Sequence, residues 1–147
     1  MKNRKSYRRS GFTLIEVVVV IVILITLASV ATPLYMNHIK TAKVGTAKTQ
    51  IKNFEQALTD YKLAVGEYPE TLQGLVENVD NNEKWSGPYL RPAVVPKDPW
   101  GNDYIYVFPG EHGEFDLSSY GADGEPGGTA DKADINNWES GDGSELK

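Results

Sequence analysis

The sequence contains no cysteine and only two histidines among its 147 residues. The lack of cysteine excludes a disulfide-stapled domain, a thiolate metal site and a cysteine nucleophile. His38 and His112 lie far apart in the sequence, and no glycine-rich phosphate-binding loop is followed by lysine. Since no nucleophile–base pair or cofactor motif can be assembled from the remaining residues, we expect a protein that is not an enzyme.

Basic residues are scarce after the first eleven positions. Residues 1–11 contain five of them and no acid, namely Lys2, Arg4, Lys5, Arg8 and Arg9. Removing these five from the 15 basic residues leaves ten against 20 acidic ones, so the formal net charge falls from −5 to −10. A chain this acidic repels phosphate backbones, and its small partners are expected to be cations rather than nucleic acids.

One long apolar block follows the basic cluster. Residues 17–28 read VVVVIVILITLA, and the stretch from Phe12 to Thr32 is 21 residues long, enough for a helix to cross a bilayer. The basic cluster is expected to stay in the cytoplasm, so the rest of the chain faces outward. The block fits a cleaved signal peptide ending at Ser29-Val30-Ala31, an uncleaved anchor, or a retained segment with a leader cut in front of it.

Glu16 distinguishes among these three possibilities. A carboxylate in a membrane segment costs on the order of 2.5 kcal/mol or more near the bilayer centre, and neither a signal peptide nor a plain anchor needs it. The segment 11–16 (GFTLIE) resembles the prepilin peptidase site of type IV pilin-like proteins. The resemblance implies cleavage after Gly11, N-methylation of Phe12, and neutralisation of the new amine by Glu16 of a neighbouring subunit, which favours polymerisation. The alternative is that Glu16 merely reaches the membrane interface.

The helical pattern continues beyond the apolar block. Apolar residues recur at alternating spacings of four and three, at Ala47, Ile51, Phe54, Leu58, Tyr61 and Val65. Gly66 suits the position after a helix, and Pro69 prevents its continuation. Pro33 either ends the transmembrane helix or bends a helix that continues past it.

The remainder of the sequence predicts loops and then strands. Five residue–proline pairs between 67 and 102 favour loop structure, with one short helix over 71–78 held by Leu72, Leu75 and Val76. Strands are expected over 103–108 and 114–120, joined by a hairpin loop over 109–113. The predicted fold is α+β: a long N-terminal helix, half in the membrane and half amphipathic, packed on a small antiparallel sheet of two or three strands.

Residues 120–138 (YGADGEPGGTADKADINNW) place Asp123, Glu125, Asp131 and Asp134 among four glycines. Clustered carboxylates repel one another, so the loop either binds a hard cation or stays solvated and flexible. Calcium accepts six to eight oxygen ligands in irregular geometry, whereas zinc favours His or Cys, which are missing here. The spacing is not that of an EF-hand, and the residues alone leave both possibilities open.

Three runs, 98–104 (DPWGNDY), 119–124 (SYGADG) and 133–138 (ADINNW), resemble the major pseudopilin family of type II secretion systems, and with the leader the resemblance covers nearly the whole chain. It implies a type IV pilin-like fold with a C-terminal calcium loop. The implied ligands are the side chains of Asp123 and Asp134 and the backbone carbonyl of Tyr120, with Asp131 as a further candidate.

The resemblance also implies the domain organisation and the function. Residues 1–11 form a cleaved leader, 12–34 a transmembrane and polymerisation helix, and 35–147 a periplasmic domain on a single-pass protein of the bacterial inner membrane. The chain would be a structural subunit of a pseudopilus that helps to drive folded proteins across the outer membrane. Its partners would be copies of itself, minor pseudopilins, an inner-membrane assembly platform and the prepilin peptidase. The alternatives are a major type IV pilin, a class that often has a disulfide this chain cannot form, and a monomeric membrane-anchored calcium-binding envelope protein.

Overall fold

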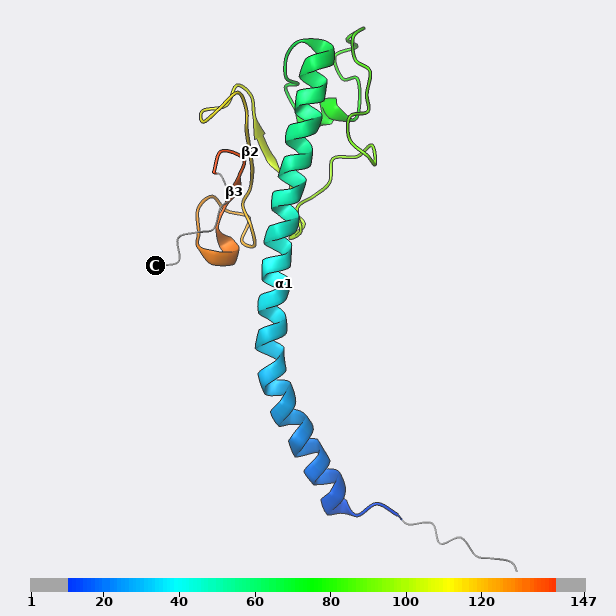
Figure 1. The fold of residues 1–147 in the computed structure, drawn as a ribbon, viewed down its shortest axis with the longest axis vertical. Helices are drawn as coiled ribbons and strands as arrows, with labels where there is room; N and C mark the ends of the chain where they lie inside the picture. Colours follow the sequence, from blue (N-terminus) through cyan, green and yellow to red (C-terminus); the bar gives the residue numbers. More distant parts are fainter. Residues whose placement is uncertain (1–10, 140–147) are drawn as a thin grey trace, which may run out of the picture. The chain divides into compact units, whose positions relative to one another are not determined.

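The computed structural model describes residues 11–139, which divide into two units between Ile39 and Lys40; the basic leader residues 1–10 lie outside this range. The elements in chain order are α1 (Leu14–Val65), the 3₁₀ helix η1 (Leu72–Leu75), β1 (Ile105–Val107), β2 (Asp116–Ser119), the 3₁₀ helix η2 (Ala130–Lys132) and β3 (Ile135–Asn136) (Figure 1). Because α1 runs through both units, its two parts are described separately.

The N-terminal part of α1 exposes its apolar side chains. The large hydrophobic residues from Phe12 to Met36 are all exposed, and α1 is the one helix within residues 11–139 that is long and apolar enough to cross a membrane. Thr13 caps this helix, since its Oγ1 accepts the backbone N–H of Glu16 at 3.3 Å. The run of β-branched residues is helical, which satisfies its backbone hydrogen bonds internally, as a segment that crosses a bilayer must.

Pro33 lies inside α1, which continues as a helix on both sides of it. Of the two possibilities for Pro33, a helix that continues past it is confirmed, and a helix that ends there is excluded. Proline cannot donate a backbone hydrogen bond to the carbonyl one turn earlier. Two hydroxyl groups in the preceding turns donate to other carbonyls of the same helix: Thr32 Oγ1 to that of Ala28 at 2.8 Å, and Ser29 Oγ to that of Thr26 at 2.8 Å.

The C-terminal part of α1 carries the predicted apolar stripe. All six predicted positions are buried, and Ala57 joins them. The helix ends at Val65, as predicted, because Gly66 adopts φ +109° and donates its N–H to the carbonyl of Lys62 at 2.8 Å. A residue with a Cβ would be strained at this φ, so the sequence sets the end of the helix.

The apolar stripe of α1 forms a core with the sheet on one side and with the loop segment 67–102 on the other (Figure 1). The sheet has the order β1-β2-β3, with both pairs antiparallel, which confirms the predicted small antiparallel sheet at three strands. Leu117 and Ile135 contribute from the sheet, and Leu72 and Leu75 from η1.

The short helix predicted over 71–78 is limited to the 3₁₀ turn Leu72–Leu75, although Leu72, Leu75 and Val76 are buried as predicted. The carbonyl of Gly74 accepts the indole N–H of Trp85 at 2.8 Å, and the carbonyl of Leu75 accepts the N–H of Tyr89 at 2.8 Å. Other segments thus occupy the carbonyls that an α-helix would need for its next turn. The two predicted strands are also shorter than expected, and each lies within its predicted range.

Candidate functional site

The acidic loop joins two neighbouring strands. It leaves β2 after Ser119 and enters β3 at Ile135, and these two residues are antiparallel partners in the sheet. Directly paired residues lie about 5 Å apart. The pairing therefore brings the two ends of the loop together, so that Tyr120 and Asp134, which are 14 positions apart in the sequence, become neighbours in space.

Asp134 has one carboxylate oxygen in use and one unused. Its Oδ2 accepts the backbone N–H of Gly127 at 2.9 Å, whereas its Oδ1 is buried and has no hydrogen-bond partner in the described chain. Asp134, Tyr120 and Pro126 line one cavity of about 300 Å³. A buried carboxylate oxygen without a partner is costly unless a cation or solvent satisfies it. The donors at this position, a carboxylate and a loop backbone rich in carbonyls, are the oxygen ligands that calcium prefers.

The other predicted ligands are less closely assembled. Asp123 is exposed, and its Oδ1 accepts the N–H of Glu125 at 3.4 Å, within its own turn. The backbone of Asp131 belongs to η2, and its side chain lies outside what the structure describes. Within residues 11–139, no three His, Asp or Glu side chains form a group that could hold a metal ion. The structure thus brings together Tyr120 and Asp134 but not Asp123, and the calcium ligands stay a prediction.

Asp98 organises the first end of the loop, a role that the sequence analysis did not identify. Its side chain is 5% exposed; Oδ1 accepts the N–H groups of Trp100 at 3.0 Å and Asn102 at 2.8 Å, and Oδ2 accepts the hydroxyl of Ser119 at 2.7 Å. An Asp at the start of an Asp-Pro-x-Gly turn is typical of a side chain that bonds to the backbone of its own turn. That signal was present in the run 98–104.

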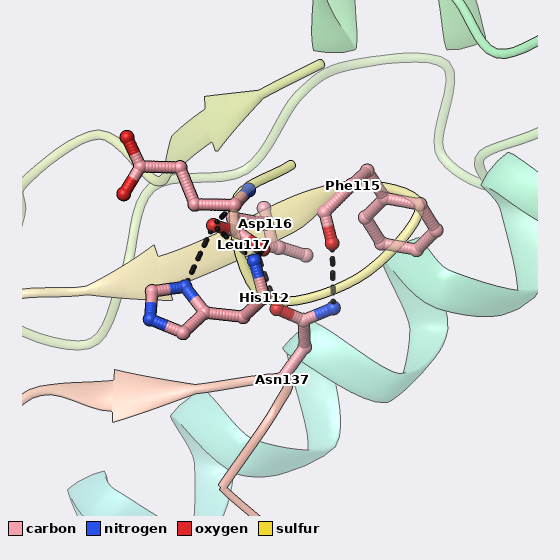
Figure 2. A network of polar contacts seen from close by, with 6 residues as sticks. His112, Phe115, Asp116, Leu117 and Asn137 are labelled. Carbon is pink, nitrogen blue, oxygen red and sulfur yellow. Dashed lines mark hydrogen bonds and ion pairs between the residues drawn. The ribbon is translucent and has the colours of Figure 1, made fainter. Parts of the chain in front are cut away.

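Asn137 holds the segment that follows the loop (Figure 2). Its Oδ1 accepts the N–H of Leu117 at 2.8 Å and its Nδ2 donates to the carbonyl of Phe115 at 3.3 Å. Its own N–H donates to the carbonyl of Leu117 at 3.0 Å. The side-chain amide therefore continues the pairing of β2 with β3 past the end of the strand.

Asp116 closes the hairpin loop between β1 and β2 (Figure 2). Its carboxylate accepts the N–H of Glu111 at 2.9 Å, the N–H of His112 at 3.1 Å and the imidazole Nδ1 of His112 at 2.9 Å. Burial by itself raises the pKa of Asp116, but the hydrogen bonds from the His112 ring and from the two backbone amides outweigh it and hold the pKa below its usual value.

The predicted cleavage site lies at the other end of the chain. Gly11 and Phe12 are exposed and precede the first residue of α1. Glu16 lies in the first helical turn. The bond between Gly11 and Phe12 is therefore in non-helical backbone, and cleavage there stays a prediction.

Comparison with known proteins identifies the family. Residues 34–138 match the sequence profile described as "Type II secretion system (T2SS), protein G". The chain belongs to this family. Residues 6–32 match the profile described as "Prokaryotic N-terminal methylation motif", so both resemblances noted in the sequence are confirmed.

Individual members of the protein G family align over almost the whole chain. The type II secretion system core protein G of Pseudomonas aeruginosa is 46% identical over 140 residues, covering 90% of this chain and 97% of that protein. The protein of the same name from Vibrio cholerae is 43% identical over 141 residues, covering 92% and 95%. The crystal structure of the major pseudopilin from the type 2 secretion system of enterohaemorrhagic Escherichia coli is similar with a TM-score of 0.56 and 32% identity, covering 70% of this chain and 92% of that one.

Proposed function

We propose that this member of the protein G family is the major structural subunit of a type II secretion pseudopilus and polymerises through α1. The observation that carries the proposal is the surface of α1, which exposes apolar side chains from Leu14 to Met36 around one carboxylate, Glu16. Lipid surrounds such a surface without driving helices together, so the attraction between subunits comes from close packing and from polar groups. Glu16 carries the carboxylate in this stretch, and it can supply a charged polar contact.

Cleavage between Gly11 and Phe12 would convert this part of the helix into an assembly site. The new amine of Phe12, once methylated, is a cation beside the bilayer, four residues from the carboxylate of Glu16 in its own chain. Pairing that amine with Glu16 of a second copy neutralises two charges that lipid solvates poorly. An uncleaved chain lacks this amine, so processing would control assembly.

The proposed location is the bacterial inner membrane, with one helix spanning it and the C-terminal domain in the periplasm. The five basic residues of the leader favour the cytoplasmic side for the N-terminus. The proposed partners are copies of this chain, minor pseudopilins, an inner-membrane assembly platform and the prepilin peptidase. The filament would help to push folded proteins across the outer membrane.

Mass spectrometry of the chain extracted from membranes tests the processing step. We expect a chain that starts at N-methylated Phe12. A chain that starts at Met1 would indicate a plain anchor, and one that starts at Thr32 would indicate a signal peptide. Either result would contradict the proposal.

A charge variant tests the assembly step. Glu16→Gln keeps the size of the side chain and removes its charge. We therefore expect the chain to insert into the membrane, and we expect no filaments to be recovered when the cells are sheared. Glu67→Gln makes the same change at an exposed position outside the apolar segment and serves as the control. Normal filaments and normal secretion with Glu16→Gln would overturn the electrostatic basis of assembly.

We further propose that the acidic loop binds calcium through Asp123, Asp134 and the carbonyl of Tyr120, with Asp131 as a further candidate. The support is the buried, unpartnered Oδ1 of Asp134 and its position in the same cavity as Tyr120. A bound calcium ion would supply the positive charge that lets the carboxylates approach one another. Its binding free energy would add to the folding free energy of a domain that has no disulfide.

Limited proteolysis of the full chain in detergent tests the calcium proposal. In the presence of calcium, the loop of the Asp123→Ala variant should be cleaved as readily as the loop of the wild type is in the presence of a chelator. Asp103→Ala removes an exposed carboxylate that pairs with Lys97 at 2.9 Å, and this control should keep the protection that calcium gives. Equal protease resistance of the wild type with and without chelator would contradict the proposal.

A further inference from the structure

We infer that Asp98, Asn102 and Ser119 form a bracket that fixes the direction of the Tyr120 carbonyl before a cation binds. The inference rests on the proposed calcium site and assigns to it three positioning residues that donate no ligand atom. All three lie on the turn before β1 or at the end of β2, outside the acidic loop itself.

The turn that carries the bracket is closed on itself. The N–H of Asp98 donates to the carbonyl of Asn102 at 2.8 Å, and the N–H of Gly101 donates to the carbonyl of Asp98 at 3.0 Å. The Asp98 carboxylate accepts two further backbone N–H groups from within the same turn. Its remaining oxygen reaches out of the turn to the hydroxyl of Ser119, a residue that is fully buried. A buried carboxylate satisfied in this way stabilises one arrangement of its donors.

The bracket holds the peptide group that contains the Tyr120 carbonyl. Ser119 Oγ accepts the N–H of Gly121 at 3.3 Å, and this N–H belongs to the same planar unit as the carbonyl of Tyr120. In a trans peptide the carbonyl points opposite to the N–H. Because the N–H points at Ser119, the carbonyl of Tyr120 is directed away from Ser119.

Asn102 holds the next peptide group along the loop. Its Nδ2 donates to the carbonyl of Gly121 at 3.3 Å. It also packs against Gly124, where φ is +68° and an added Cβ would lie 3.3 Å from that same nitrogen. Asp123 directly precedes Gly124, so Asn102 contacts the loop on both sides of the stretch that leads from the Tyr120 carbonyl to the Asp123 carboxylate.

A bracket formed in advance lowers the ordering cost that accompanies cation binding. Residues that orient metal ligands without touching the metal typically change its affinity by 10- to 100-fold when they are removed. We therefore expect Asn102→Ala and Ser119→Ala each to weaken calcium binding by about 10- to 100-fold. Asp103→Ala truncates the residue next to Asn102 and removes an exposed charge, but it removes no contact of the bracket. The calcium affinity of this control variant should therefore stay close to that of the wild type.

The test is calorimetric titration of the full chain in detergent with calcium, combined with thermal unfolding in chelator. A purely structural role would lower the unfolding temperature in chelator and leave the calcium affinity unchanged, and that result would overturn the inference. If the wild type binds and the two variants bind equally well, the bracket fails while the calcium site stands. If the wild type shows no binding, the calcium site and the bracket fail together.

Amide hydrogen exchange in chelator gives a second measurement that needs no variant. The bracket predicts that the Gly121 amide, which donates to Ser119, exchanges more slowly than the Gly124 amide in the calcium-free chain. Equally fast exchange at both amides would show that the bracket does not exist before the cation binds. Should Ser119→Ala fail to fold, this comparison and Asn102→Ala still decide the inference.

Discussion

The imidazole of His112 lies flat against the indole of Trp138, with ring centroids 4.1 Å apart and planes inclined by 4°. His112 belongs to the loop between β1 and β2, and Trp138 follows β3, so the two rings join segments on either side of β2. The same imidazole donates to Asp116 through Nδ1. The chain that leaves the acidic loop is thus fastened to the hairpin, a few residues after Asp134.

This contact predicts that the hairpin loop holds β3 in place. Stacked aromatic pairs contribute about 0.5–1.5 kcal/mol beyond the area they bury, and His112→Ala also removes the hydrogen bond to Asp116, so it should lower the free energy of unfolding by at least an amount of that order. Amide exchange in β3 should become faster. His38→Ala makes the same change on the exposed surface of α1 and should leave β3 unaffected. Unchanged exchange at Ile135 in His112→Ala would contradict the prediction.

The lowered pKa of Asp116 predicts a loss of stability in acid. Because the folded chain binds a proton at this carboxylate less readily than the unfolded chain, stability rises with pH wherever the unfolded chain is protonated. The contribution is complete above the unfolded pKa of about 3.9 and is lost as the pH falls through the lower folded pKa. Urea unfolding at a series of pH values in chelator measures this effect. As the pH falls, the free energy of unfolding should decrease less for Asp116→Asn than for the wild type.

His112 supplies one of the hydrogen bonds that lower this pKa, so its removal gives an internal check. In His112→Ala, the free energy of unfolding should decrease in acid less than in the wild type but more than in Asp116→Asn. The reason is that the backbone amides at positions 111 and 112 still donate to the Asp116 carboxylate. Parallel pH profiles for all three chains would show that Asp116 does not cause the decline.

The core predicts a larger effect at Phe54. This side chain is 1% exposed and packs edge-to-face on Tyr104 at a centroid distance of 5.1 Å. Phe54→Ala should destabilise the domain by about 3–5 kcal/mol, because the change leaves a cavity. Leu63→Ala on the same helix truncates a side chain that is 80% exposed, and its effect should stay within about 0.5 kcal/mol. Comparable unfolding midpoints for the two variants would contradict the assignment of the core.

The sequence could predict the elements whose pattern is local. The helix stripe, its end at Gly66 and the apolar segment all follow from residue spacing, and all are found. Of the two longer strands, the first was located by its aromatic and β-branched residues and the second by its alternating pattern. The third strand was not, because Ile135 and Asn136 have no alternating pattern of their own and are extended only through pairing with β2.

The acidic loop shows the same limit at the level of the site. Its carboxylates and glycines mark it as a candidate, but the closeness of Tyr120 and Asp134 depends on the register between Ser119 and Ile135. Asp98 contributes through a contact with Ser119 that spans 21 positions. Contacts of this length arise from the packed fold, and no periodicity in a single sequence reports them.

Asn137 gives the sharpest test of how the loop is closed. Its side chain pairs with the N–H of Leu117, a fully buried residue, so Asn137→Ala leaves a buried donor unsatisfied and should cost about 1–3 kcal/mol. Asn53→Ala, at an exposed position of α1, should be neutral or slightly stabilising, because alanine favours the helix more than asparagine does. Urea unfolding should therefore show a clearly lower free energy of unfolding for Asn137→Ala, and an unchanged or slightly higher one for Asn53→Ala. Asn137→Asp keeps the acceptor for Leu117 and loses the donor to Phe115, so a stability between those of the wild type and Asn137→Ala would show that both hydrogen bonds contribute.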